Sequence, residues 1–209
     1  MIYSIRPMVK GDLGQVTEID REAFPTQWPP ANYRQELQNQ LAHYIVARDD
    51  TKKVEVSHAR SPRALSTLRS WLRWLGRRRP RPDDPPPRAF QQYIVGFSGI
   101  WVITDEAHIT NIAVRQTYQG RGLGEMLLIA TIDLARELNA RSMTLEVRAS
   151  NTVAQNLYTK YGFAKVGVRP GYYLDNREDG VIMTTENINS EAFQVNLKKV
   201  RKTLAGKLY

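Results

Sequence analysis

The chain has 209 residues, no cysteine and a formal net charge of +9 at pH 7. This length accommodates one well-buried domain with additions, and the lack of cysteine excludes a disulfide framework, a thiolate metal site and a cysteine nucleophile. The three histidines are scattered singly, so we expect no metal site. No segment approaches the roughly 18 apolar residues of a membrane span and the N-terminus has no apolar run of signal-peptide length, so we expect a cytoplasmic protein.

The positive charge is concentrated in two segments. Residues 51–90 carry +8 and residues 190–209 carry +4, which leaves −3 for the rest of the chain. We therefore predict a main domain over residues 1–187, interrupted by a basic insertion at 51–90 that is rich in proline and arginine, and a basic helical tail at 188–209. Because the basic charge lies outside the main domain, we expect no specific contact with DNA.

In the first half of the chain, apolar periodicity predicts alternating strands and helices. The expected elements are a strand at 2–7, a helix at about 13–24 with a turn and N-cap at Gly11 and Asp12, a second helix at 31–40, and strands at 43–48 and 92–103. Phe24 and Trp28 lie in a proline-containing connection between the two helices. This connection either caps the core or forms a wall of a substrate pocket.

The insertion differs in composition from its surroundings. Its run of prolines at 80–87 excludes a helix or a central strand, because proline fixes φ and has no N–H to donate. Before it, residues 61–76 show a stripe of leucines and a Ser-Pro start that are typical of a helix. Three interpretations remain open: a solvated or half-disordered insertion, a helix packed on the domain or on a protein partner, and a basic contact with membrane or ribosomal RNA.

The second half of the chain is predicted to alternate more regularly. The expected elements are a hairpin of strands 94–103 and 107–114, a helix after Gly120, a strand at 142–147, a helix from Asn151 to Gly162, strands at 163–168 and 180–186 separated by a turn at 170–173, and a basic helix from residue 189 or 190 to about 204. We treat this last helix as an addition to the domain.

A glycine-rich turn precedes the helix that follows Gly120. Gly120, Gly122 and Gly124 alternate with other residues, so side chains leave the backbone amides of the turn uncovered. The first turn of a helix has amides without an internal partner and a partial positive charge, which suit a phosphate. The spacing fits neither a dinucleotide fingerprint nor a nucleotide P-loop. A tight turn with close helix packing is the alternative to a phosphate site.

The spacing Gln119-x-x-Gly122-x-Gly124 resembles the acyl-CoA signature of the GCN5-related N-acetyltransferases. The later motifs are similar to the ribosomal-protein-alanine N-acetyltransferases of that family: Leu-Glu-Val-Arg-Ala-Ser-Asn at 145–151, Leu-Tyr at 157–158, Tyr-Gly-Phe at 161–163 and Gly-Tyr-Tyr at 171–173. The resemblance covers residues 1–50 and 91–187. It implies an α/β (α+β) fold whose mixed, mostly antiparallel sheet splits between strand 107–114 and the Glu146 strand, with helices on both faces.

The same resemblance implies acetyl-CoA as co-substrate, direct acetyl transfer to the α-amino group at a protein N-terminus, and alanine-starting ribosomal protein S18 as the acceptor. Its implied cofactor-binding residues are Ile112, Ala113, Val114, Gln119, Gly120, Arg121, Gly122, Leu123, Gly124 and Asn151. Phe24, Trp28, Tyr172 and Tyr173 would line the peptide pocket. Gly171 departs from the pattern, because relatives commonly have a larger polar residue there.

Two side chains are implied as catalytic, and each has a structural alternative. Glu146 is either a general base for the substrate ammonium or an exposed strand residue. Tyr158 is either a general acid for the departing thiolate or a core aromatic. Asn151 either binds the CoA arm or caps its helix.

Two other functions remain open. One is transfer to a small-molecule amine such as an amino acid, a polyamine or a drug. The other is a non-catalytic module that binds acetyl-CoA or docks on the ribosome through the basic insertion or tail.

Overall fold

The computed structural model describes residues 2–26, 31–56 and 89–206, which form one seven-stranded sheet in the order β1-β2-β3-β4-β5-β7-β6. Neighbouring strands are antiparallel, except that β4 and β5 are parallel. The strands are β1 (Tyr3–Pro7), β2 (Ala42–Val56), β3 (Ala89–Ile103), β4 (Glu106–Val114), β5 (Ser142–Arg148), β6 (Phe163–Tyr173) and β7 (Glu178–Thr185). Trp28 and the predicted helix and proline run of the insertion lie outside the described residues.

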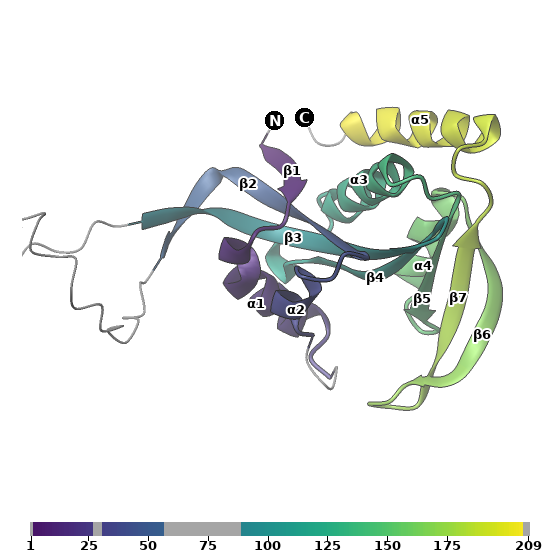
Figure 1. The fold of residues 1–209 in the computed structure, drawn as a ribbon, viewed down its shortest axis with the longest axis horizontal. Helices are drawn as coiled ribbons and strands as arrows, with labels where there is room; N and C mark the ends of the chain where they lie inside the picture. The colour runs from purple at the N-terminus through teal and green to yellow at the C-terminus, as the bar shows by residue number, and fades with distance from the viewer. Residues whose placement is uncertain (1, 27–30, 57–88, 207–209) are drawn as a thin grey trace, which may run out of the picture.

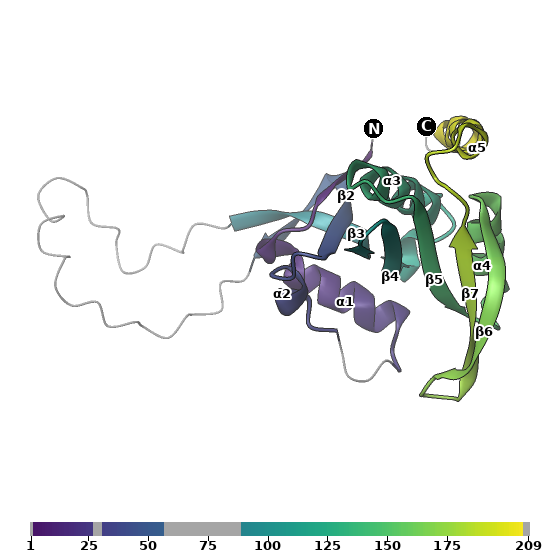
Figure 2. The same ribbon diagram turned by 45° about the vertical axis from the view of Figure 1, so that its right-hand side comes forward.

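Helices cover both faces of this sheet. α1 (Leu13–Ala23) and α2 (Tyr33–Glu36) lie on one face and α3 (Leu123–Glu137) lies on the other (Figures 1 and 2). α4 (Thr152–Lys160) packs against β6, and α5 (Glu191–Ala205) contacts α3. The predicted α/β fold with a mostly antiparallel sheet and helices on both faces is confirmed.

The helix boundaries at the N-terminal end differ from the prediction for local reasons. Asp12 precedes α1, but its carboxylate makes no cap hydrogen bond and instead accepts from Arg6 and from the Val9 amide. The second helix, predicted over 31–40, is a single turn capped by Asn32, whose side chain accepts from the Gln35 amide. The prediction of a longer helix there was wrong.

The β2–β3 hairpin is longer than predicted. Its strands pair from Ala42↔Trp101 to Val56↔Ala89, so residues 51–56, which were assigned to the insertion, belong to the sheet. Two register shifts near Asp49 accommodate the polar residues of this stretch. Lys52 is tied to the domain because its ammonium donates to the Tyr118 hydroxyl at 2.7 Å. Strand pairing therefore overrides the change in composition at residue 51.

β6 also continues further than predicted. The expected turn at 170–173 lies inside the strand, and residues 174–177 connect β6 to β7. Gly171 has a positive φ of 59° and its amide donates to Asp179 at 2.8 Å. The pairing register shifts between Arg169 and Tyr173, so the Pro-Gly pair produces an irregular strand instead of a turn.

α5 is part of the domain core, which corrects its prediction as an addition. Ser190 caps the helix by accepting from the Phe193 amide, as one of the two predicted caps. The buried face of α5 joins the cluster that contains α3, β5 and β7, through Phe193, Leu197, Val200 and Leu204. Their spacing of three or four residues places all four on one side of the helix. The basic residues of this segment lie on the remaining surface.

Candidate active site

The glycine turn has the geometry of an anion site. Gly120 and Gly122 have φ of 73° and 82°, in the region that side chains disfavour, and Gly122 is the N-cap of α3. The hydrogen-bonded series of α3 begins with the Met126 amide, which donates to the Gly122 carbonyl. The amides of the first turn therefore have no acceptor within the helix. Arg121 lies beside them, with its guanidinium 4.8 Å from the Tyr118 ring centroid.

β4 and β5 separate along the end of β4 that leads to this turn. Their pairing ends with His108↔Thr144, and a register shift between β3 and β4 leaves Thr110 without a partner residue. The Arg115 amide donates to Val95 on β3. Because donors alternate along an antiparallel strand, the backbone groups of Ile112 and Val114 face away from β3, toward the separation. The edge can add an extended ligand as a further strand.

Ala113 and Gln119 contribute differently from their neighbours. The Ala113 side chain is buried in the core cluster that contains α1, and its backbone groups face β3, so Ala113 presents no backbone group to the separation. The Gln119 side-chain amide donates to the Val114 carbonyl at 3.2 Å. The Gly124 position approaches α4, where an added Cβ would lie 3.9 Å from Leu157. Leu123 is buried and anchors the start of α3.

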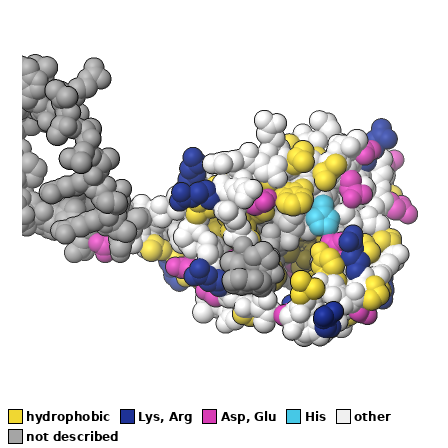
Figure 3. All heavy atoms as spheres, turned by 60° about the horizontal axis from the view of Figure 1, so that its bottom comes forward, with side chains coloured by type: hydrophobic (Ala, Val, Ile, Leu, Met, Phe, Trp, Pro, Cys, Tyr) yellow, Lys and Arg dark blue, Asp and Glu magenta, His cyan; other side chains and the backbone are white. Residues whose placement is uncertain are grey.

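Glu146 lies two residues beyond the last β4–β5 pair. Leu145 and Val147 are in the core on the α3 face, so Glu146 points to the opposite face, which bears α1 and α2. Figure 3 views the molecule from that side and shows basic, acidic and hydrophobic side chains around a histidine. Its side chain is only 7% exposed. One carboxylate oxygen is 3.1 Å from Arg169 Nε and the other is 3.2 Å from His108 Nε2. Glu146 is therefore a buried, paired carboxylate and not an exposed strand residue.

Tyr158 lies on α4 among core residues, with its ring centroid 5.7 Å from that of Phe163. Burial, with a smaller contribution from Tyr173, raises the pKa of Tyr158 well above that of a free phenol. The proton therefore stays on its oxygen at neutral pH. Burial of the ring raises the pKa of Tyr173 to about 12, and Glu146 is among the neighbours that add to this increase. Both candidate catalytic groups thus lie within electrostatic reach of Tyr173.

Asn151 caps α4, as one of its two interpretations predicted. Its side-chain oxygen accepts from the Ala154 amide at 3.0 Å. The residue is exposed, so its side-chain NH₂ group faces solvent. The cap and a contact with a ligand are compatible, because they use different atoms of the same amide.

Two tyrosines at the end of β6 lie beside a polar network that includes Arg148. The rings of Tyr172 and Tyr173 pack edge to face with centroids 5.1 Å apart, and the Arg148 guanidinium lies 4.0 Å from the Tyr173 centroid. Phe24 is half-buried against the α1 side of the core. Of the four predicted pocket residues, the structure brings the tyrosine pair together. Phe24 packs instead against the core cluster that contains α1.

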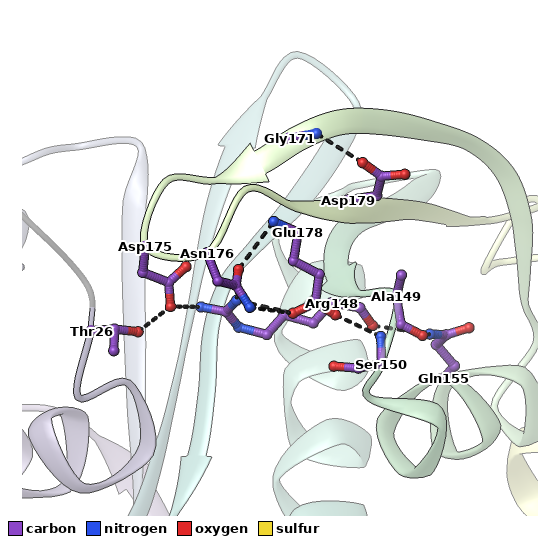
Figure 4. Close-up of polar contacts among 10 residues, drawn as sticks. All are labelled: Thr26, Arg148, Ala149, Ser150, Gln155, Gly171, Asp175, Asn176, Glu178 and Asp179. Carbon is purple, nitrogen blue, oxygen red and sulfur yellow. Dashed lines mark hydrogen bonds and ion pairs between the residues drawn. The ribbon is translucent and has the colours of Figure 1, made fainter.

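The network in Figure 4 joins segments that are distant in sequence. Arg148 donates to Asp175 at 2.8 Å and to Glu178 at 3.2 Å, and the Thr26 hydroxyl donates to Asp175. Thr26 lies in the connection after α1, whereas Asp175 lies between β6 and β7. We name the contact Thr26–Asp175–Arg148 the clasp. It ties the connection after α1 to the connection between β6 and β7.

The charges of the clasp persist at neutral pH. The hydrogen bond from Thr26, followed by that from Arg148, lowers the pKa of Asp175. Hydrogen bonds from the side chain and backbone of Ser150 lower the pKa of Glu178 to about 2. Because the pKa of Asp175 is lowered, the clasp is complete above the usual carboxyl range and is lost only as the pH falls through this lowered pKa.

A family model for the acetyltransferase (GNAT) family matches residues 13–163. This range contains the glycine turn, the β4–β5 separation, Glu146 and Tyr158. The chain belongs to the GNAT family of acetyltransferases. Among the described residues, the structure of this acetyltransferase holds no cluster of three or more His, Cys, Asp or Glu residues suited to a metal ion, and no helix long and apolar enough to cross a membrane.

Similar proteins agree with this assignment. The chain is 33% identical over 181 residues to a putative [ribosomal protein bS18]-alanine N-acetyltransferase of Bacillus subtilis, covering 86% of this chain and 93% of that protein. It is 42% identical over 92 residues to the [ribosomal protein bS18]-alanine N-acetyltransferase of Escherichia coli, covering 43% of this chain and 62% of that protein. The crystal structure of the Escherichia coli ribosomal-protein-S18-alanine N-acetyltransferase superposes with a TM-score of 0.64 at 25% identity, over 90% of this chain and 97% of that one. A GNAT acetyltransferase of Elizabethkingia anophelis, crystallised with acetyl-CoA bound, has the same fold, with a TM-score of 0.58 at 18% identity over 88% and 98% of the two chains.

Sequence reasoning missed several polar residues around the candidate site of this acetyltransferase. His108 and Arg169 contact Glu146, Asp175 forms the clasp, and Glu36 accepts from the Trp101 indole at 2.7 Å. Each comes from a different segment, so no spacing along the chain indicates that they meet. The one available signal was alternation: His108 lies between the buried Ala107 and Ile109, which places it on the face of Glu146.

Proposed function

We propose that this acetyltransferase uses acetyl-CoA to acetylate the α-amino group of a protein N-terminus, with the N-terminal alanine of ribosomal protein S18 as the first candidate acceptor. The observation that carries the proposal is the buried Glu146 carboxylate at the opening between β4 and β5, beside the tyrosine pair. The names of the Bacillus subtilis and Escherichia coli relatives support the choice of acceptor.

Acetyl-CoA, when bound, supplies an acetyl group activated as a thioester. The amides of residues 119–124 would hold its pyrophosphate, and Arg121 adds positive charge. The backbone of Ile112 and Val114 would pair with its pantetheine arm, and an amide near Val114 would stabilise negative charge on the carbonyl oxygen. Asn151 would contact the arm through its free NH₂ group.

Glu146 accepts one proton from the substrate ammonium, directly or through water, which leaves a neutral amine as the nucleophile. The amine nitrogen bonds to the carbonyl carbon, the C–S bond breaks, and the Tyr158 hydroxyl gives its proton to the thiolate. Tyr158 recovers a proton from the second N–H of the new amide. Each turnover therefore yields the acetylated amine, CoA and one released proton. The high pKa of Tyr158 suits a group that must enter the reaction protonated.

The aromatic walls and the clasp favour an extended peptide as acceptor. Tyr172 and Tyr173 offer flat apolar surface for the first residues, while the clasp limits the width of the groove. An α-amino group titrates near pH 7.7–8.0, so a useful fraction is neutral at physiological pH, unlike the ε-amino group of lysine. Glu146 therefore needs to deprotonate only the charged part of the N-terminal amine population.

Mass spectrometry with acetyl-CoA and a peptide panel tests the proposal. The panel contains the S18 N-terminal sequence, variants at its first residue, and the same peptide with a blocked α-amino group but a free lysine. Transfer to the free α-amino group of the alanine peptide is expected. Faster transfer to spermidine or free amino acids in direct competition would replace the peptide by a small amine, and no transfer to any amine would remove the enzymatic proposal.

Gly122→Ala is expected to weaken acetyl-CoA binding about tenfold. An alanine in the left-handed region costs about 1–2 kcal/mol, and the loop must return to this conformation to present its amides. Isothermal titration calorimetry measures the change. Gly14→Ala is the control, because an added Cβ there meets nothing within 4 Å and the residue lies in α1, away from the turn. Equal affinity for wild type and Gly122→Ala would contradict the assignment of the turn.

Asp175→Asn is expected to raise the KM for peptide several-fold while acetyl-CoA affinity stays unchanged. The substitution removes the charge that holds Arg148 and weakens the contact with Thr26, so the groove loses its fixed width. Asp133→Asn is the matched control: it breaks the Arg201–Asp133 pair between α3 and α5, which lies outside the groove. A KM that responds equally to both variants would count against the clasp.

Deletion of residues 57–88, closed by a short glycine linker, is expected to leave peptide acetylation nearly unchanged. The deletion keeps the paired strand ends Val56 and Ala89 and the Lys52–Tyr118 contact. We also propose that the basic insertion contacts the ribosome, so the deleted protein should bind ribosomes more weakly in co-sedimentation. A loss of peptide turnover would instead make the segment part of the site.

A further inference from the structure

Glu36 places a carboxylate on the face of the sheet that bears α1 and α2 (Figure 1). It is the last residue of α2, and its Oε2 accepts from the Trp101 indole at 2.7 Å and from the Tyr44 hydroxyl at 3.4 Å. The Tyr44 hydroxyl also lies 3.4 Å from Oγ1 of Thr110, the β4 residue that has no partner on β3. Both donors therefore meet the same oxygen of Glu36 and fix the carboxylate against the sheet.

The second carboxylate oxygen of Glu36 is open to a ligand. Within residues 2–26, 31–56 and 89–206, Oε1 accepts no hydrogen bond and the carboxylate forms no ion pair with Lys, Arg or His. In the same ranges no buried side-chain oxygen or nitrogen lacks a partner, so Oε1 reaches solvent. Glu36 is nevertheless partly buried, and burial of a carboxylate without a cation is unfavourable. A cation brought by a ligand would offset this cost.

Trp101 provides a flat surface next to this carboxylate and connects it to Glu146. Its side chain is 37% exposed although its N–H is bound. Trp101 pairs in register with His108, whose Nε2 is 3.2 Å from Glu146. Paired residues of antiparallel strands share a face. Trp101 lies on β3 and Glu146 on β5, so about two strand spacings, or roughly 10 Å, separate their strands.

A cationic side chain close to the N-terminus of the acceptor matches this distance. An extended peptide advances about 3.3 Å per residue. With its α-amino group at Glu146, its second and third residues would pass near Trp101. Arginine fits such a position better than lysine, because its planar guanidinium can stack on an indole while its N–H groups donate to a carboxylate.

We propose that Glu36 and Trp101 form a subsite for an arginine side chain at the second or third residue of the acceptor. The inference rests on the proposed function and deepens it, since it defines the class of N-terminus that the enzyme prefers. The guanidinium stacks on the exposed indole and donates to Glu36 Oε1, while Tyr44 keeps its contact with Oε2. Burial raises the pKa of Tyr44 to about 12, with Glu36 adding to the increase, so its hydroxyl remains a donor.

A peptide series tests the subsite on the wild-type protein. The peptides share one alanine-starting sequence and carry Arg, Lys, Gln or Glu at the second or at the third position. At one of these positions kcat/KM is expected to be about tenfold higher with Arg than with Gln, mainly through KM, because hydrogen bonds between charged groups are the stronger ones. Lys should lie between them and Glu should be poorest. The preference should shrink as the salt concentration rises.

Two variants of Glu36 separate recognition from a structural role. In Glu36→Gln the carbonyl oxygen still accepts from the Trp101 indole but carries no charge, so the Arg-to-Gln ratio of kcat/KM is expected to approach one. Glu36→Lys is expected to reverse the order and favour the Glu peptide over the Arg peptide, whereas loss of a purely structural contact would affect all peptides alike. Glu137→Gln, at the exposed end of α3, is the control that keeps the wild-type ratio.

Binding is measured apart from turnover by calorimetry with the acetylated product peptides. The Arg product is expected to bind the wild type about tenfold more tightly than the Gln product. Glu36→Gln should bind the two products with equal affinity. This comparison does not depend on Glu146 or Tyr158, because no proton or acetyl group is transferred.

The outcomes distinguish the subsite from the proposed function. Equal kcat/KM for the Arg and Gln peptides, in a wild-type protein that acetylates both, overturns the subsite alone. An Arg preference that persists in Glu36→Gln does the same. A wild-type protein that acetylates no amine removes the proposed function and the subsite with it.

Discussion

Glu146→Gln is expected to lower kcat for peptide acetylation by about a hundredfold or more, because positioned general bases contribute about 10²–10⁴ to rate. Glutamine preserves the size of the side chain and one carbonyl oxygen for Arg169 or His108, but it cannot take a proton. Acetyl-CoA affinity is expected to stay unchanged, since Glu146 lies on the face that bears α1 and α2 and not at the glycine turn. Steady-state kinetics and calorimetry measure the two quantities separately.

Glu137→Gln is the matched control for this substitution. It removes the same charge from the exposed end of α3 and is expected to keep wild-type kcat. Glu146→Gln combined with Tyr158→Phe addresses the whole mechanism, because the double variant lacks both the proposed base and the proposed acid. Near-normal turnover in the double variant would mean that the chemistry is carried out by other groups.

Leu197→Ala is expected to lower the free energy of unfolding by about 2–5 kcal/mol. Leu197 is 3% exposed and packs with three other apolar residues of α5 into the main core. Removal of all of α5 would abolish the burial of all four apolar side chains, and the summed loss would approach the total stability of a typical domain, about 5–15 kcal/mol. The protein truncated after residue 188 is therefore expected not to remain folded. Urea denaturation followed by circular dichroism measures both variants.

Val195→Ala tests whether the effect depends on burial. Val195 lies on the same helix but is 62% exposed, so its truncation is expected to change stability by no more than about 0.5 kcal/mol. If Leu197→Ala were as mild as Val195→Ala, α5 would not be packed on the core in solution. The basic charge of the helix plays no part in this prediction.

Local signals were sufficient for most elements and for the glycine turn before α3. Apolar periodicity predicted α1, α3 and α4, because the apolar residues of each helix face the core. The glycines at 120 and 122 predicted a turn with uncovered amides, and both have positive φ in the structure. Composition was less informative at element ends. It placed a boundary at residue 51 and a turn at residue 170, and in both places pairing with a neighbouring strand continued the sheet.

The candidate site shows the same division. The sequence by itself determined the family and nominated the glycine turn, Glu146 and Tyr158 as site residues, because short motifs and strand alternation record them. Only the tertiary structure decided what surrounds them: His108 and Arg169 on the Glu146 carboxylate, Thr26 on Asp175, and α5 in the core. These contacts join residues between 23 and 149 positions apart. Sheet topology brings such residues together, and no local pattern records the distance between them.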